Sequence, residues 1–73
     1  MKIVDGRGLH PPEPFERVVQ ALTELAPGEQ VKLIISQEPR PLYRFLERNG
    51  YTYKAQCLPH GQFEILIWEL PED

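Results

Sequence analysis

The sequence predicts an α/β fold of the α+β two-layer sandwich type, with elements in the order β-α-β-α-β-β. Two segments place apolar residues three and four positions apart, which is the spacing of a helix with one buried face. Four other segments are β-branched runs or alternate between apolar and polar residues, as strands do. Crossovers between parallel strands are right-handed, so both helices are expected on one face of a four-stranded mixed sheet. The 73 residues, 1–73, are expected to form a single domain.

The helices are expected at the two segments with helical spacing. The first starts at Glu13-Pro14 and is stopped by Pro27-Gly28, because proline is favoured in the first turn of a helix and Pro-Gly ends one. The second opens at Pro41 and ends at Asn49-Gly50, where Gly50 can adopt the left-handed conformation of a helix cap.

The strands are expected at residues 1–4, 30–36, 51–57 and 63–68. Residues 30–36 form an apolar run, which predicts a central strand buried on most of both sides. Residues 51–57 alternate, so Cys57 is expected on the core side of a half-buried strand. A tight turn at 59–62 precedes the last strand.

One face of this sheet has no predicted cover. If Phe63, Ile65 and Ile67 face the helices, Leu66 and Trp68 face away. We expect further residues on the same face: Val4, Ile34, Thr52, Lys54 and Glu64. An apolar cluster with a polar rim is typical of an association site, for another protein or for a second copy as a homodimer. The alternative is an ordinary exposed tryptophan shielded by its neighbours.

The loop before the first helix is the most constrained segment. Asp5-Gly6-Arg7-Gly8-Leu9-His10-Pro11-Pro12-Glu13-Pro14 contains two glycines and three prolines. The pattern resembles the signature of the TusA/SirA-like small domains, in which Arg-Gly-Leu and any residue precede Cys-Pro-x-Pro. Arg7-Gly8-Leu9 and Pro12-Glu13-Pro14 match that signature, and Pro11 stands where the carriers have their cysteine.

The resemblance implies a TusA/SirA-like domain with strand order 1-2-4-3. In the sulfur-carrier members the cysteine holds a persulfide, and proline has no side-chain nucleophile. The chain therefore resembles the cysteine-less, uncharacterised branch of the superfamily, of the domain of unknown function 2249 type. Members of that branch also resemble it at Glu38-Pro39-Arg40-Pro41-Leu42.

The composition of the chain limits which kinds of partner and which cellular compartment are expected. The net charge of −3 argues against nucleic acid, and no apolar run is long enough for a membrane span. One cysteine excludes an internal disulfide and fits a reducing, bacterial-type cytoplasm. So small a domain is expected to leave little room for an apolar pocket, and we expect no cofactor.

Three loop residues are candidates for binding: Arg7, His10 and Glu13. Arg7 can contact an anion or a partner carboxylate, or it can pair with Asp5 and serve only the loop. His10 can act as acid, base or ligand near neutral pH, but catalysis needs a positioned partner group. Glu13 disfavours an anion at the helix start, and its proline-rich surroundings can serve only to fix how strand meets helix.

The second helix carries Arg40, Arg44 and Arg48 on one face. Arg40 and Arg44 are candidates for an acidic protein partner or a phosphate, and the alternative is a solvated helix face with local ion pairs. With Trp68 added, the candidate binding residues are Arg7, His10, Glu13, Arg40, Arg44 and Trp68. We expect no catalytic residue and no metal site.

Three functions follow from these residues. The first is a non-enzymatic protein-binding or adaptor module that has lost the carrier cysteine. The second is sulfur transfer by Cys57, which would need an exposed thiol. The third is metal or small-ligand binding near His10, Cys57 and His60, although zinc sites usually need three or four protein ligands.

Overall fold

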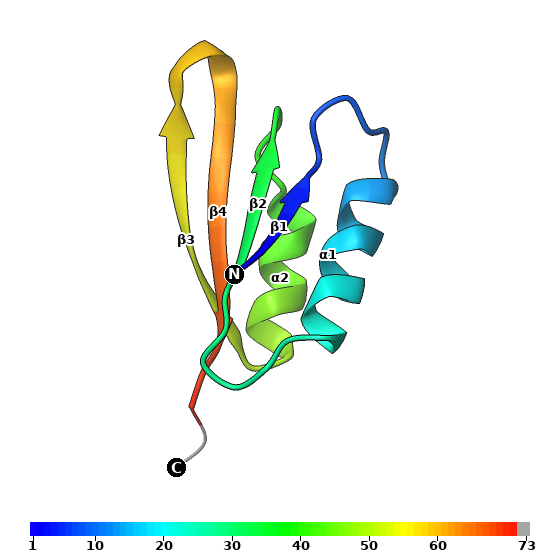
Figure 1. The fold of residues 1–73 in the computed structure, drawn as a ribbon. Helices are drawn as coiled ribbons and strands as arrows, with labels where there is room; N and C mark the ends of the chain where they lie inside the picture. Colours follow the sequence, from blue (N-terminus) through cyan, green and yellow to red (C-terminus); the bar gives the residue numbers. More distant parts are fainter. Residues whose placement is uncertain (72–73) are drawn as a thin grey trace.

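The structure is a computed structural model that describes residues 1–71. Its elements are β1 (Lys2–Asp5), α1 (Glu13–Thr23), β2 (Val31–Ile35), α2 (Arg40–Arg48), β3 (Tyr51–Leu58), the 3-10 turn η1 (Pro59–Gly61) and β4 (Gln62–Glu69) (Figure 1). The sheet order is β1-β2-β4-β3, with β1 parallel to β2 and β4 antiparallel to both of its neighbours. Both helices lie on one side of the sheet (Figure 1). The predicted architecture and strand order are confirmed.

One core lies between the helices and the sheet. The strand register places Val4, Leu33 and Ile65 in one row across β1, β2 and β4, all facing the helices. Burial of such side chains is the main favourable term in the stability of a domain this small. The buried apolar residues are Val4, Val18, Leu22, Val31, Leu33, Leu42, Leu46, Ile65 and Ile67.

The helix ends agree with the predicted signals to within a few residues. α1 begins at Glu13 with Pro14 in its first turn, but it ends at Thr23, so Leu25 packs against the core from the following loop. α2 begins at Arg40, one residue before the predicted start. Gly50 follows α2 with a φ of 79°, which is the predicted left-handed cap.

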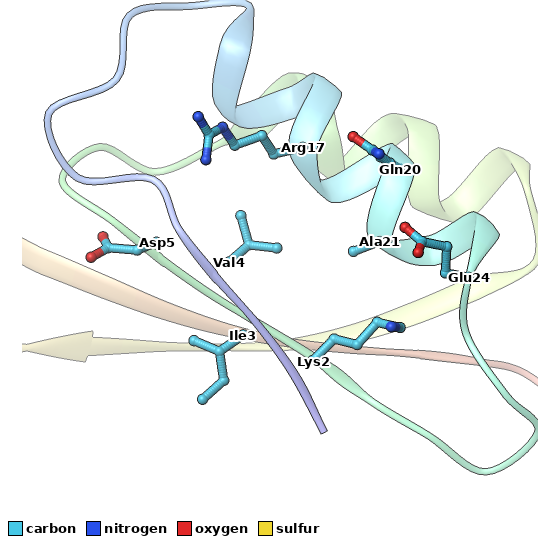
Figure 2. Close-up of a pocket in the computed structure, with 8 residues that line it drawn as sticks. All are labelled: Lys2, Ile3, Val4, Asp5, Arg17, Gln20, Ala21 and Glu24. Atoms are coloured by element: carbon cyan, nitrogen blue, oxygen red, sulfur yellow. The ribbon is translucent and has the colours of Figure 1, made fainter.

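The uncovered face of the sheet, here called the open face, differs from the prediction at β1 and β2. The predicted placement of Val4 on this face is wrong. Only 8% of Val4 is exposed, and it points toward α1, whereas Ile3 points away from the helix (Figure 2). Both residues are apolar, so alternation in a four-residue strand did not decide its face. β2 is buried only on its helix side, because Lys32 and Ile34 face the uncovered side. The open face consists of Ile3, Asp5, Lys32, Ile34, Thr52, Lys54, Gln56, Leu58, Gln62, Glu64, Leu66 and Trp68.

The β3–β4 hairpin extends past the starts of the helices (Figure 1). Eight residues of β3 span ~27 Å, whereas nine residues of α2 span ~14 Å. Ala55 and Cys57 are therefore exposed although their side chains lie on the helix side of the sheet. Cys57 thus lies on the core side of the sheet, as expected, but it is exposed, so the expectation that it belongs to the core is wrong. The predicted turn at residues 59–62 is present, with His60 at a φ of 67°.

Within residues 1–71, no helix is long and apolar enough to cross a membrane.

Candidate functional site

An apolar groove of about 390 Å³ opens between the N-terminal ends of α1 and α2. Its volume lies in the range of ~300–1,000 Å³ that is typical of ligand pockets, so the expectation of little room for a pocket is wrong. Only two of the lining residues, Gln37 and Glu38, have polar side chains. The groove, here called the proline-lined groove, is formed by Pro11, Pro12, Pro14, Phe15, Leu33, Ile35, Gln37, Glu38, Pro39, Pro41 and Leu42.

The same four-residue pattern starts both helices and forms the two sides of the groove. Pro12–Phe15 and Pro39–Leu42 each read proline, charged residue, proline, apolar residue. Proline fixes the backbone φ, so these sides are rigid before any ligand arrives. The repeated pattern is visible in the sequence, but its meaning depends on the parallel helices, which bring both starts to the same end of the molecule (Figure 1).

The floor of the groove is the hydrophobic core. Leu33 and Leu42 are both buried and line the groove from β2 and α2. Phe15 lines it from α1 and packs edge-on against Phe45, with ring centroids 5.3 Å apart. A ligand that enters the groove therefore contacts well-packed apolar side chains, whose position is fixed by the fold.

The β1–α1 loop is held to the sheet at Gly6. Its N–H donates to the carbonyl oxygen of Ile34 at 2.7 Å. A β-carbon at Gly6 would lie 3.2 Å from that oxygen and 3.5 Å from Cβ of Pro14, which lines the groove. The absent side chain lets the loop approach the sheet and sets the position of the α1 start.

Arg7 serves the loop, as one of its two predicted roles requires. Its backbone N–H and its Nε donate to Asp5 Oδ1 at 3.1 and 2.9 Å, and its Nη2 donates to Asp5 Oδ2 at 2.9 Å. These hydrogen bonds favour the charged carboxylate and lower the pKa of Asp5 from 3.8 to about 2. Arg7 is not among the residues that line the groove.

Charges flank the groove on both helices. Glu13 of α1 accepts a hydrogen bond from Arg17 at 3.0 Å. Arg40 of α2 is 83% exposed and donates from Nε to Glu38 at 3.3 Å. Arg44, one turn further along α2, forms no ion pair within the described part of the chain. Glu13 and Arg17 therefore offset each other, as do Glu38 and Arg40, so Arg44 is the α2 arginine that has a charge to offer a ligand beside the groove.

The remaining candidate residues lie apart from the groove walls. His10 is exposed in the β1–α1 loop, and its side chain makes no hydrogen bond within residues 1–71. Trp68 is half-buried on the open face. Glu13 and Arg40 stand between lining prolines at the starts of α1 and α2 but do not themselves line the groove, and Trp68 lies on the other face of the sheet.

Tyr43 is a side chain that the sequence did not single out. Its ring stacks on Tyr53 with centroids 4.2 Å apart, while its buried hydroxyl finds no hydrogen-bond partner within residues 1–71. Burial, then the negative charge of Glu38, raise the pKa of Tyr43 above 10.0. An unpaired buried hydroxyl is destabilising, so this site is a weak point of the α2–β3 contact.

No metal cluster forms from the third set of candidates. His10 lies in the β1–α1 loop, while Cys57 and His60 lie at the hairpin. Among residues 1–71, no three His, Cys, Asp or Glu side chains come close enough together to hold a metal ion.

A second hollow, of about 580 Å³, lies between β1 and α1 and is polar. Figure 2 shows Lys2 and Asp5 on the strand opposite Arg17, Gln20 and Glu24 on the helix. Lys2 of β1 and Arg17 and Glu24 of α1 bring both signs of charge to this hollow, so it selects no ligand charge.

The comparison with known families agrees with this architecture. Residues 3–69 match the family described as "Uncharacterized conserved protein (DUF2249)", and the chain belongs to that family. Its fold is also that of a SirA-like protein from Desulfitobacterium hafniense, whose crystal structure was solved as a structural genomics target. The two share 26% identity and a TM-score of 0.83 over 92% of this chain and 95% of that one. No functionally curated protein matches the chain.

Proposed function

We propose that this chain is a cytoplasmic bacterial protein-binding module without catalytic activity, and that a segment of another protein docks in the proline-lined groove. The observation that carries the proposal is the groove itself, which is apolar, rigid and open at the common end of both helices. Pro11 lines it, and by the resemblance to the sulfur carriers Pro11 stands where their cysteine is. The position used for group transfer in those relatives is here part of an apolar wall.

The lining and the flanking charges define the chemistry of the partner segment. Apolar walls on three sides favour one bulky aromatic or aliphatic side chain as the anchor. Arg40, which is paired with Glu38 of the lining, and Arg44, which forms no ion pair within the described residues, lie on α2 and favour a carboxylate just outside the groove. The expected partner therefore presents an extended segment with a bulky apolar residue and neighbouring acidic residues.

Selection from a library of random 12-residue peptides displayed on phage tests this proposal. The purified wild-type chain should enrich peptides that combine an aromatic or large aliphatic residue with nearby Asp or Glu. Pro11→Arg places a charged side chain at the groove wall and should reduce binding of a selected synthetic peptide at least tenfold. Arg40→Glu should reduce it about threefold, because an exposed charge contributes less than a buried apolar anchor.

Pro27→Arg is the matched control, because Pro27 is an exposed proline in the loop after α1, at the other end of the helix. It should leave peptide affinity unchanged. Enriched peptides without an apolar anchor, or equal binding to the Pro11→Arg variant, would show that the groove is not the docking site. Circular dichroism of each variant separates loss of binding from loss of fold.

Sulfur transfer by Cys57 is a second candidate, because the thiol is exposed. Cys57 also pairs with Phe63, which pairs with Ile35 at the groove. Mass spectrometry after incubation with a persulfide-donating enzyme distinguishes the two candidates. An added sulfur atom on Cys57 that is absent from Cys57→Ser supports transfer, and an unmodified thiol excludes it.

A further inference from the structure

The open face carries its charges in two separate rows. The strand register places Ile3, Lys32, Leu66 and Lys54 side by side across the sheet. The next row holds Asp5, Ile34, Glu64 and Gln56. Both charges of the first row are positive and both charges of the second are negative, so we call them the lysine row and the carboxylate row.

Apolar side chains alternate with these charges. Ile3 is 65% exposed, and Ile34 and Leu66 are half-buried with no helix or strand packed over them within residues 1–71. Trp68 is half-buried at one end of the face, where it borders a hollow shared with the loop after α1. Lys32 and Glu64 meet at the centre of the face, with 3.5 Å between Nζ and Oε1. The two lysines equal the two carboxylates in number, and Asp5 is also paired with Arg7 of the same chain, so this face has no excess negative charge although the chain has a net charge of −3.

We propose that the open face binds a second copy of this chain in a two-fold symmetric dimer. Consider a two-fold axis that lies in the plane of the interface, runs across the strands and passes between the two rows. It places the lysine row of each copy over the carboxylate row of the other. Lys32 then lies over Ile34 of the second copy, between the strand positions of Asp5 and Glu64.

The same axis gives Trp68 an apolar neighbour. Trp68 lies one row beyond the lysine row, so the axis sets it over Gln62 of the second copy. Gln62 pairs with Leu58, an apolar residue at the end of β3 that faces the same side. The arrangement is self-complementary in charge and in apolar contact, as a two-fold interface requires. A partner with a single sign of charge would repel one of the rows.

The area of the face sets the expected affinity. Four strands ~4.8 Å apart give a width of about 19 Å, and the longest strands are ~27 Å long. Because β1 and β2 are only four and five residues long, the face covers about 400 Å², below the ~800 Å² that each partner buries in a standard interface. We expect a reversible dimer with a dissociation constant of about 10–100 µM.

Sedimentation equilibrium from about 1 µM to 1 mM, followed in parallel by Trp68 fluorescence, tests the dimer. Trp68 is the single tryptophan, so its emission should shift to shorter wavelength as the dimer forms. Lys32→Glu gives a copy whose central charges are all negative, and Glu64→Lys gives one whose central charges are all positive. Each variant alone should dimerise at least tenfold more weakly than the wild type, and an equimolar mixture of the two should regain wild-type affinity.

Arg48→Glu and Glu16→Lys are the matched controls, because they change the charge equally on the exposed helices. Both should dimerise as the wild type does. A monomer throughout the concentration range would overturn the proposal and leave the face to a different partner. Association that neither reversal weakens, or a mixture no stronger than its components, would also overturn it. Peptide binding in the proline-lined groove is measured separately, so failure of one proposal does not affect the other.

Discussion

The proline-lined groove and the open face are both apolar surfaces at the boundary of the same sheet, but they place their charges differently. The groove has one charged lining residue, Glu38, which is paired with Arg40, while Glu13 lies on its flank and its walls are fixed by prolines. The open face mixes charge with apolar side chains in both of its central rows. The arrangement in the groove suits a bulky apolar anchor from an unrelated protein. The arrangement on the open face suits binding to the same face of a second copy.

The groove lies on the hydrophobic core and the open face does not. Truncating one leucine in each surface should therefore give the largest difference in the free energy of unfolding. Leu33→Ala, on the groove floor, leaves a cavity in the core and should lower the free energy of unfolding by about 2–5 kcal/mol. Leu66→Ala, on the open face, should lower it by less than ~1 kcal/mol. Urea denaturation measures both, and equal losses would contradict the division of the sheet into a packed face and an open face.

Gly6 links the groove to the sheet, and Gly6→Ala should cost about 1–3 kcal/mol. The added methyl group meets the Ile34 carbonyl oxygen, so the loop and the α1 start must move. Thermal unfolding measures the loss. Gly8→Ala is the comparison, because a β-carbon there meets no atom within 4 Å and any cost comes from its φ of 77° alone. An Ala at position 6 that leaves stability unchanged would mean that the loop does not fix the groove.

Salt should affect the two surfaces unequally. Because the dimer pairs a lysine row with a carboxylate row, raising NaCl from about 0.05 to 0.5 M should weaken it several-fold. Binding of a selected peptide in the groove should change less than about threefold, since its anchor is apolar. Parallel titrations at both salt concentrations test this. A salt-insensitive dimer would mean that apolar contacts alone hold the open face.

Tyr43 belongs to neither region, since it packs from α2 against Tyr53 of β3, and Tyr43→Phe should raise the free energy of unfolding by up to ~1 kcal/mol. The substitution removes the unpaired buried hydroxyl and keeps the ring that stacks on Tyr53. Because the pKa of Tyr43 is raised in the folded state, the wild type should also lose stability as the pH rises above 10, and the variant should lose less. Guanidinium denaturation at neutral and alkaline pH measures both effects. A clear loss of stability at neutral pH would show that the hydroxyl has a partner.

Substitution of Asp5 should have the smallest effect on stability, because its side chain is exposed. Its pKa is lowered from 3.8 to about 2, so the folded state binds fewer protons than the unfolded state between these pH values. The stability that the Asp5–Arg7 contacts provide is therefore present above pH 4 and lost as the pH falls toward 2. Asp5→Asn should flatten the dependence of the unfolding midpoint on pH in this range. An unchanged slope would mean that Arg7 does not hold the carboxylate in solution.

Periodicity predicted the elements well, because long apolar patterns report which side of a helix or strand is covered. The helix starts at Glu13 and near Pro41, and the facing of Phe63, Ile65 and Ile67, depend on such local patterns. The strand order came from the resemblance to the TusA/SirA-like domains, since no local pattern distinguishes which strands pair. β1 was too short for alternation to place Val4.

The exposure of Cys57 and the presence of the groove depend on lengths and directions in three dimensions. Cys57 is exposed because β3 is longer than the helix that packs on it. The groove exists because parallel helices bring two Pro-x-Pro starts together, and each start looks like ordinary helix capping in the sequence. Glu13 and Arg40 were named as candidates, whereas Phe15 and Leu42 were assigned only to the core.

A titration of ¹⁵N-labelled protein with the peptide acetyl-Trp-Asp-Glu-amide, followed by amide chemical shifts, tests the central claim most directly. The account predicts saturable shifts at Phe15, Ile35 and Leu42, with Thr52 and Lys54 unchanged. It also predicts that Pro11→Arg abolishes these shifts and Pro27→Arg preserves them. Shifts confined to the open face, or none at millimolar peptide, would contradict the assignment of the proline-lined groove as the docking site.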